Sequence, residues 1–260
     1  MAKESPVKWE QLLQEAVSKP GTINQAYRAF HSYSTGNQLL ALWQCHSRGM
    51  PVGPISTYSG WQSKARYVKK GEKALTLCMP CSFTKKSTDD NGDEQEDHVN
   101  IFVYRNNWFV LSQTEGQDVV VESPPTWDHV KALEARGIEQ VDFDHMNGNC
   151  QGFAQDRKIS VSPIAANPLK TSIHEIAHVI LGHTVERMED GDFTPRNTKE
   201  MEAEAVTLIV LDSLDLPGGD DCRGYIQSWY GQQAIGEKEA RRIFTASDKI
   251  LKAGQKGDVK

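Results

Sequence analysis

The sequence predicts an α+β protein with two domains, at residues 1–122 and 123–260. In the first domain, helices pack on a small antiparallel sheet. The second domain is mainly helical and has a small sheet of its own. Apolar residues recur at helical spacing before residue 47, and two later segments are rich in β-branched and aromatic residues, as strands are. Helical patterns then dominate after Pro124 and Pro125, which mark a crossing between domains.

Three helices and two strands are expected in the first domain. "VKWEQLLQEAV" has apolar residues at helical spacing, and "SKPGT" ends that helix. Further helices are expected over 23–30 and 35–46, and Gly49 closes the second of these. "KALTLCMP" and "HVNIFVYRNNWFVL" read as strands, with residues 84–97 as a charged loop between them.

The second domain shows clear signals for a hairpin and for helices. "QGFAQDRKISVSP" predicts two strands that turn at residues 155–157. Asn167 suits a helix N-cap and Pro168 the first helical position, so a helix is expected to run to Leu181, with Gly182 ending it. "NTKEMEAEAVTLIVLDSLDLPGG" predicts another helix, ended by its proline and glycines.

Composition limits the classes of protein to which the chain can belong. Of its 260 residues, 38% are hydrophobic and 25% charged, which is typical of a soluble globular protein. No apolar run approaches the roughly 18 residues of a membrane span, and the opening segment lacks the apolar core of a signal peptide. Five scattered cysteines argue against a disulfide framework. We therefore expect a cytoplasmic protein with no membrane partner.

Charge is distributed unevenly along the chain. The net charge is −6, yet residues 1–80 hold 10 Lys and Arg against 4 Asp and Glu. Residues 81–145 hold 5 basic and 14 acidic side chains. A basic first third indicates a polyanionic partner, although a solvated surface of mixed charge fits the same counts.

The segment "SIHEIAHVILGHT" carries the pattern H-E-x-x-H. His174 and His178 are four residues apart, so on a helix they share a face and can hold one metal ion. Glu175 lies about 100° further round and can act as general base toward a water molecule at the open coordination position. Apolar neighbours indicate that this helix is buried, where ionisable groups need a partner. Zinc is the expected ion, or another divalent metal such as manganese.

A catalytic zinc site needs a third protein ligand. The extended metzincin pattern would put glycine at 181 and histidine at 184, but these positions are Leu181 and Thr184. The ligand should therefore come from a downstream helix, "KEMEAEA". We favour Glu204 over the two alternatives there, Glu200 and Glu202.

Other chemistry-bearing residues give weaker signals. Tyr225, in "GYIQSWYG", is a candidate donor to a developing oxyanion, although such a tyrosine is more often part of a core or a rim. His183 is expected to cap the helix rather than to support a ligand. Cys78 and Cys81 form a lone C-x-x-C without the second pair that a zinc ribbon needs, so we expect core cysteines.

The segment "YSGWQSKARYVKKGEK" interleaves aromatic and basic side chains. Single-stranded nucleic acid is bound by positive charge along its backbone and by aromatic faces that stack on its bases. An ordinary lysine-rich loop with core aromatics is the alternative interpretation. The candidate contacts to single-stranded DNA are Tyr58, Trp61, Lys64, Arg66, Tyr67, Lys69, Lys70 and Lys73.

Several of these segments occur together in one known family. "INQAYRAFHSYSTGNQLLALWQC", "GWQSKARYVKKGEKALTLCMP", "FVLSQTEG", "KISVSPIAANPLKTSIHEIAHVILGH", "EAEAV" and "GYIQSWYG" resemble the ArdC-type antirestriction proteins of conjugative plasmids, in the same order and over nearly the whole chain. The resemblance implies an N-terminal single-stranded-DNA-binding domain and a C-terminal zincin-like metallopeptidase domain. It also implies protection of incoming plasmid DNA from host restriction during conjugation.

The resemblance also implies roles for individual residues. His174, Glu175 and His178 match the metal motif of the family, and Glu204 matches its downstream acid. The aromatic and basic positions near 61–73 fall in its DNA-binding domain. The three closely spaced glutamates of this chain leave the third ligand open.

Three functions remain as alternatives. The first is a DNA-tethered metalloprotease that cuts an unknown protein substrate, which the "KISVS" strand could align by edge pairing. The second is a binding protein that shields DNA and whose metal domain is structural or cryptic. The third is a regulatory zincin that cleaves a repressor and has no affinity for DNA, which the basic first third disfavours.

Overall fold

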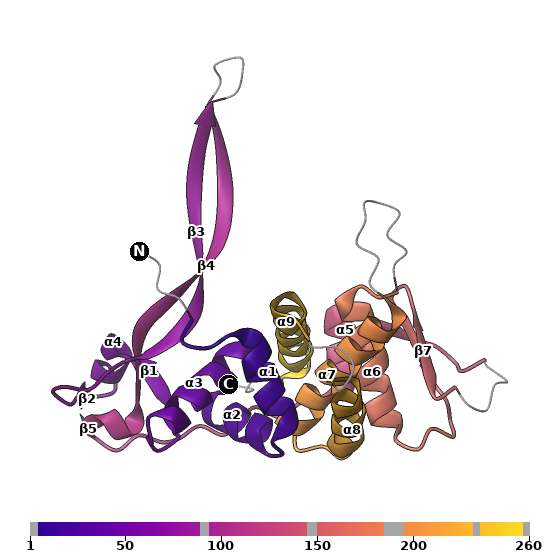
Figure 1. Cartoon of the computed structure of the whole chain (residues 1–260), viewed down its shortest axis with the longest axis horizontal. Coiled ribbons are helices and arrows are strands. Elements are labelled where there is room, and N and C mark those ends of the chain that lie inside the picture. Colours follow the sequence, from indigo (N-terminus) through magenta and orange to yellow (C-terminus); the bar gives the residue numbers. More distant parts are fainter. Residues whose placement is uncertain (1–4, 89–93, 145–149, 185–194, 231–234, 257–260) are drawn as a thin grey trace. The chain divides into compact units, whose positions relative to one another are not determined.

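The computed structural model describes residues 5–88, 94–144, 150–184, 195–230 and 235–256. The chain divides into two compact units. Unit 1 contains Leu40–Val121 and the first seven residues, and unit 2 contains Lys8–Leu39 and Glu122–Lys260. Each unit combines helices with small sheets, which confirms the predicted α+β class (Figure 1).

Unit 1 is built from short elements around two small antiparallel sheets. One sheet has the strand order β1-β4-β3 and the other pairs β2 with β5. A buried glutamine ties the end of helix α3 to the first sheet, because the side chain of Gln44 donates to the carbonyl of Thr76 and accepts from its amide. The elements are α3 (Thr35–Ser47, which begins in unit 2), β1 (Ile55–Thr57), α4 (Tyr58–Gln62), β2 (Arg66–Val68), β3 (Leu75–Thr88), β4 (Glu94–Val110), η1 (Leu111–Gln113) and β5 (Thr114–Gly116).

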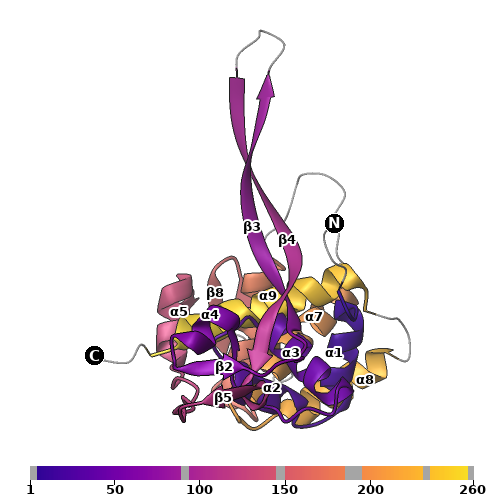
Figure 2. The same ribbon diagram turned by 90° about the vertical axis from the view of Figure 1, so that its left-hand side faces the viewer.

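Strands β3 and β4 form a long two-stranded ribbon, which Figures 1 and 2 show from two sides. Their register runs from Leu75 opposite Trp108 to Thr88 opposite Glu94. The predicted loop over 84–97 is therefore wrong over most of its length, because the strands continue through it to Thr88 and from Glu94. The many charged residues of this segment obscure its strand pattern in the sequence.

The two cysteines of the C-x-x-C pair lie on β3 and are half-buried rather than in the core. The expectation of core cysteines is wrong here. At Cys78 and Cys81 the ribbon is two strands wide, because β1 pairs with β4 only at the other end, opposite Trp108 to Val110.

Unit 2 is mainly helical, and α7 lies at its centre. This helix packs against α2, α6, α8 and α9, and eleven of its residues are buried. The elements are α1 (Trp9–Ser18), α2 (Thr22–Phe30), α5 (His129–Arg136), β6 (Glu139–Gln140), β7 (Gly152–Gln155), β8 (Lys158–Val161), α6 (Pro168–Leu181), α7 (Arg196–Ser213), α8 (Gly219–Tyr230) and α9 (Glu237–Gly254).

The sheet of unit 2 has the strand order β6-β8-β7. The hairpin of β7 and β8 was predicted correctly, with Gln155 opposite Lys158. However, β8 also pairs in parallel with the two-residue strand β6, so "KISVS" is the central strand and its start, at Lys158 and Ile159, has a neighbour on both sides. The edge strand of this hairpin is β7.

Helices α1 and α2 group with unit 2, whereas the sequence predicts them in a domain at 1–122. Trp9 makes an edge-on ring contact with Phe244 of α9, and Asn24 donates to the carbonyl of Asp212 in α7. Arg223 of α8 donates to the carbonyls of Ala16 and Val17. Helical periodicity predicts an apolar face, but it does not say which part of the chain covers that face.

None of the described helices is long and apolar enough to span a membrane.

Candidate metal centre

Helix α6 holds the H-E-x-x-H residues, and local signals set both of its ends. The side chain of Asn167 accepts a hydrogen bond from the amide of Lys170, and Pro168 is the first helical residue. Gly182 ends the helix in the left-handed conformation, at φ 75°. These boundaries confirm the predicted ones. Between them, the helix places His174 and His178 on one face.

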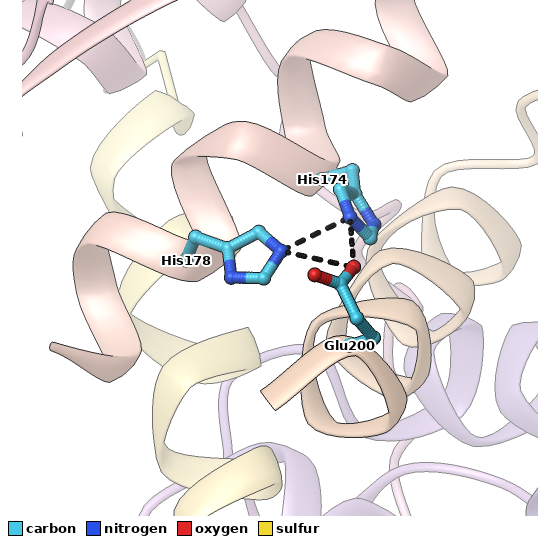
Figure 3. Close-up of side chains that lie close together, drawn as sticks. All are labelled: His174, His178 and Glu200. Carbon is cyan, nitrogen blue, oxygen red and sulfur yellow. Dashed lines mark hydrogen bonds and ion pairs between the residues drawn. The ribbon is translucent and has the colours of Figure 1, made fainter. Parts of the chain in front are cut away.

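The two histidines face a carboxylate from α7. Their Nε2 atoms lie 3.1 Å apart, and each lies 3.5 Å from Oε2 of Glu200 (Figure 3). Among the described residues, these three form a group of potential metal ligands within 4.8 Å of one another.

The spacing of these atoms suits one divalent ion. With bonds of about 2.0–2.2 Å, two ligands of a tetrahedral ion lie roughly 3.3–3.6 Å apart. The two separations of 3.5 Å to Glu200 fall within that range, and the 3.1 Å between the two nitrogens is slightly shorter. Two imidazole nitrogens and one carboxylate oxygen are also a ligand set that zinc and related metals accept.

The favoured third ligand, Glu204, does not lie in this group. Its Oε1 is 3.6 Å from Nδ1 of His174, on the far side of the ring from Glu200. Nδ1 of His174 and Oε2 of Glu204 are buried without a hydrogen-bond partner, so a small shift would join the two side chains. The geometry therefore favours Glu200 as the ligand and Glu204 as the group that orients His174.

Glu175 lies beside the cluster in a cleft of about 680 Å³. Its side chain is only 7% exposed. The cleft is lined by α6, by the start of α7 and by strand β7, which contributes Gly152, Phe153 and Ala154. Gly152 comes so close that an added Cβ would lie 3.1 Å from Oε1 of Glu175. An extended chain lying in this cleft would pass between β7 and the histidines.

Burial and neighbouring charges shift the pKa values at the site. Burial raises the pKa of Glu175 above 4.5, although His174 and His178 oppose the shift. For His174, burial is the largest effect and lowers the pKa, but Glu200, Glu204 and Glu175 together raise it above 6.5. Hydrogen bonds from His174 and His178 hold the pKa of Glu200 well below its usual range. The carboxylate of Glu200 is therefore ionised, as a metal ligand must be.

Tyr225 lies on α8 near the acidic side of the site. Its side chain is 42% exposed, and it is not among the residues that line the cleft. Burial raises its pKa, and the charges of Glu200 and Glu204 raise it further. The phenol therefore keeps its proton at neutral pH and can donate it in a hydrogen bond.

Unit 1 brings six of the eight predicted DNA contacts to its surface. Tyr58 is 48% exposed and Tyr67 is 56% exposed, so both rings can be reached by a base. The exposed basic residues are Lys64, Lys69, Lys70 and Lys73.

Trp61 and Arg66 are buried instead. Trp61 is 1% exposed and its indole donates to the carbonyl of Phe109. Arg66 donates to both oxygens of Thr114. Neither side chain can contact DNA in this structure, so both predictions are wrong. In sequence, an aromatic or basic residue that fixes a loop looks the same as one that binds a ligand.

Two supporting residues were missed or misjudged in the sequence. His183 caps α6 through its backbone, but its ring also contacts His178 and Glu202. Glu202, one of the three candidate ligands, is fully buried and lies against His183 and Arg242, away from the cluster of His174. Only the position of α7 relative to α6 distinguishes the three glutamates.

Comparisons with known proteins agree with the resemblance seen in the sequence. The family described as the N-terminal domain of anti-restriction factor ArdC matches residues 3–109. The fold matches the crystal structure of the antirestriction ArdC protein from R388 plasmid in its metal-free form, at 20% identity and a TM-score of 0.51, over 94% of each chain. Residues 3–109 thus match the N-terminal domain of the ArdC family, and the chain shares the fold of the R388 protein.

A second structure of the R388 protein, bound to Mn(II), matches with 19% identity and a TM-score of 0.50, again over 94% of each chain. No curated protein matches the chain. At these identities the likeness concerns the fold, so the chemistry of this chain has to be argued from its own residues.

Proposed function

We propose that this ArdC-type protein is a divalent-metal-dependent peptidase joined to a unit that binds single-stranded DNA. One observation carries the proposal. Two imidazoles and a carboxylate lie close enough together to bind one ion, and a buried glutamate lies beside them in a cleft. Burying such groups is unfavourable unless a partner satisfies them, and one metal ion satisfies all three.

His174, His178 and Glu200 would hold the ion. Zinc suits this ligand set, and the R388 protein was crystallised with Mn(II), so either metal is a candidate. When bound, such an ion lowers the pKa of coordinated water to about 7 and polarises a carbonyl group. The remaining catalytic roles would fall to protein side chains.

Glu175 is the proposed general base. Its raised pKa lies closer to neutrality than that of an exposed glutamate, which suits a group that accepts a proton and then passes it to the leaving amine. Tyr225, which stays protonated, is the proposed donor to the oxyanion that develops on the carbonyl.

The edge strand β7 is the proposed guide for the substrate. Gly152, Phe153 and Ala154 line the cleft, and an edge strand can pair with an extended peptide. A peptide paired in this way would have its scissile bond next to Glu175. The role predicted for β8 from the sequence thus passes to its neighbour.

The exposed aromatic and basic surface of unit 1 is the proposed DNA site. Tyr58 and Tyr67 can stack on bases while the surrounding lysines contact phosphates, which gives affinity without sequence specificity. During conjugation, binding of the entering strand in the cytoplasm would bring the peptidase to proteins that act on it. A DNA-shielding protein with a structural metal domain is the second candidate, because the same surface would bind DNA without any proteolysis.

Glu175→Gln separates the two candidates. The change keeps the size of the side chain and the metal ligands but removes the base, which lowers proteolysis about 10²–10⁴-fold. Transfer of an unmodified plasmid into a restricting host should then lose its protection, while metal content and DNA binding stay unchanged.

The matched control is Glu134→Gln, an exposed carboxylate on α5 that lies outside the cleft. It should protect as well as the wild type does. If Glu175→Gln also protects fully, the peptidase is not needed and shielding is the function.

A further inference from the structure

A third histidine lies directly behind the proposed metal centre. Gly182 turns the chain at the end of α6, and the ring of His183 folds back toward His178. The Nδ1 atoms of the two rings are 3.0 Å apart, and the rings meet edge to face with centroids 5.1 Å apart. This contact uses the nitrogen of His178 that points away from Glu200.

The other side of His183 faces a buried carboxylate. Its Nε2 lies 3.0 Å from Oε2 of Glu202, which is 0% exposed. Arg242 of α9 lies 3.4 Å from the same oxygen and also donates to the carbonyl of Leu181. Four groups from α6, the turn after it, α7 and α9 thus form a chain that ends at a proposed metal ligand.

The direction of each hydrogen bond along this series of side chains follows from the carboxylate of Glu202. An ionised Glu202 only accepts, so Nε2 of His183 must donate to it. Neutral imidazole carries one proton, so Nδ1 of His183 is then an acceptor and takes the proton of Nδ1 of His178. His178 is left with a lone pair on Nε2, the atom that faces His174 and Glu200.

We propose that His183 and Glu202 are positioning residues that fix the tautomer and ring orientation of His178 for metal binding. The inference rests on the proposed metal centre. Metal-bound histidines commonly donate their second nitrogen to an oxygen acceptor; here an imidazole is interposed and carries the effect to a carboxylate. Arg242 balances the buried charge of Glu202, which explains how a carboxylate is retained in the core.

The test measures affinity for Mn²⁺ by isothermal titration of the full-length protein. Removing an outer partner of a ligand typically weakens metal binding 10–100-fold. We expect about that loss for His183→Leu, which fills the space but offers no acceptor, and for Glu202→Gln, which no longer dictates the tautomer of His183. His183→Asn keeps an acceptor near the position of Nδ1 and should recover most of the affinity.

A comparison of Mn²⁺ affinity with melting temperature across the variants distinguishes a positioning role from a packing role. Ile250→Ala, a core change on α9 away from this chain, should lower the melting temperature without changing the affinity for Mn²⁺. If His183→Leu does not fold, the comparison of His183→Asn with Glu202→Gln decides in its place.

Two results would count against the proposals, and they differ. Equal Mn²⁺ affinity in the wild type, His183→Leu and Glu202→Gln would remove the positioning role and leave the metal centre intact. A wild-type protein that binds neither Mn²⁺ nor Zn²⁺ would remove the metal centre itself.

Discussion

Glu200 and Glu204 lie one turn apart on α7, and each faces a different nitrogen of His174. A carboxylate beside Nε2 can bind the same metal ion as that nitrogen, whereas one at Nδ1 holds the ring in place. The two glutamates are therefore expected to take different roles despite their equal chemistry. Position on the helix, rather than residue type, assigns those roles.

Substitution of the two glutamates tests this assignment. We expect Glu200→Gln to weaken binding of Mn²⁺ more than the roughly 10- to 100-fold that loss of an outer partner causes, and Glu204→Gln to stay within that range. Competition with a chelator of known affinity measures both. A larger loss for Glu204→Gln would reverse the assignment and restore the ligand favoured from the sequence.

Metal binding should depend on pH through His174. Its pKa is raised above 6.5, so a proton competes with the metal already near neutrality. Affinity for Mn²⁺ is expected to fall as pH decreases through that raised value. The stability of the metal-free protein should depend on pH in the opposite direction. The raised pKa of His174 adds folding stability below pH 6.5 that is lost as pH rises through the raised value. Titrations with Mn²⁺ and melting curves of the metal-free protein between pH 5 and 8 measure the two trends.

At the scale of elements, the contact of β7 with α6 sets the width of the cleft. Gly152 permits it, because an added Cβ would lie 2.7 Å from Cγ2 of Thr171 and 2.9 Å from the carbonyl oxygen of Ser160. The second of these neighbours is backbone and cannot rotate away. The strand can therefore approach the helix only where the side chain is absent.

Gly152→Ala should push β7 away from α6. We expect a loss of about 1–3 kcal/mol in the free energy of unfolding, as for other overpacked sites, together with weaker peptidase activity. Gly224→Ala is the matched control, since it lies in α8 with nothing within 4 Å of the added atom. Chemical denaturation measures the stability of both variants. If Gly152→Ala is as stable as Gly224→Ala, β7 adjusts freely.

Elements with strong local signals were predicted well from the sequence. The cap at Asn167 and the left-handed Gly182 depend on neighbouring residues alone, so α6 was placed correctly. Strand β6 is two residues long and pairs in parallel, which leaves no pattern to read, and the central place of β8 was missed as a result. The choice between Glu200 and Glu204 as third ligand cannot be made from the sequence for a related reason: it depends on how α7 crosses α6.

At the scale of the whole molecule, the charges of unit 1 do not form one basic surface. Residues 40–80 hold 6 Lys and Arg against 1 Glu, whereas residues 81–121 hold 3 against 8 acidic side chains. The predicted basic first third is therefore a local feature beside an acidic segment. Binding of a polyanion should depend on the lysines near α4 and β2 rather than on the net charge of the unit.

Charge reversal at Lys70 and Lys73 tests that expectation. We expect weaker binding of single-stranded DNA and a salt dependence shallower by roughly 1–2 in the slope of log affinity against log salt. Lys19→Glu with Lys131→Glu changes the net charge equally on unit 2 and should have little effect. Fluorescence anisotropy at several salt concentrations gives the slopes. Equal effects of the two double variants would place DNA binding elsewhere.

Because α1 and α2 group with residues after Glu122, unit 2 is assembled from two separated stretches of chain. A ribosome releases these helices before Leu40–Val121, yet α7, α8 and α9, on which they pack, emerge after it. Between the two events the continuous stretch Leu40–Val121 is complete and free to fold. During translation, the part proposed to bind DNA is thus available before the proposed metal ligands have been made.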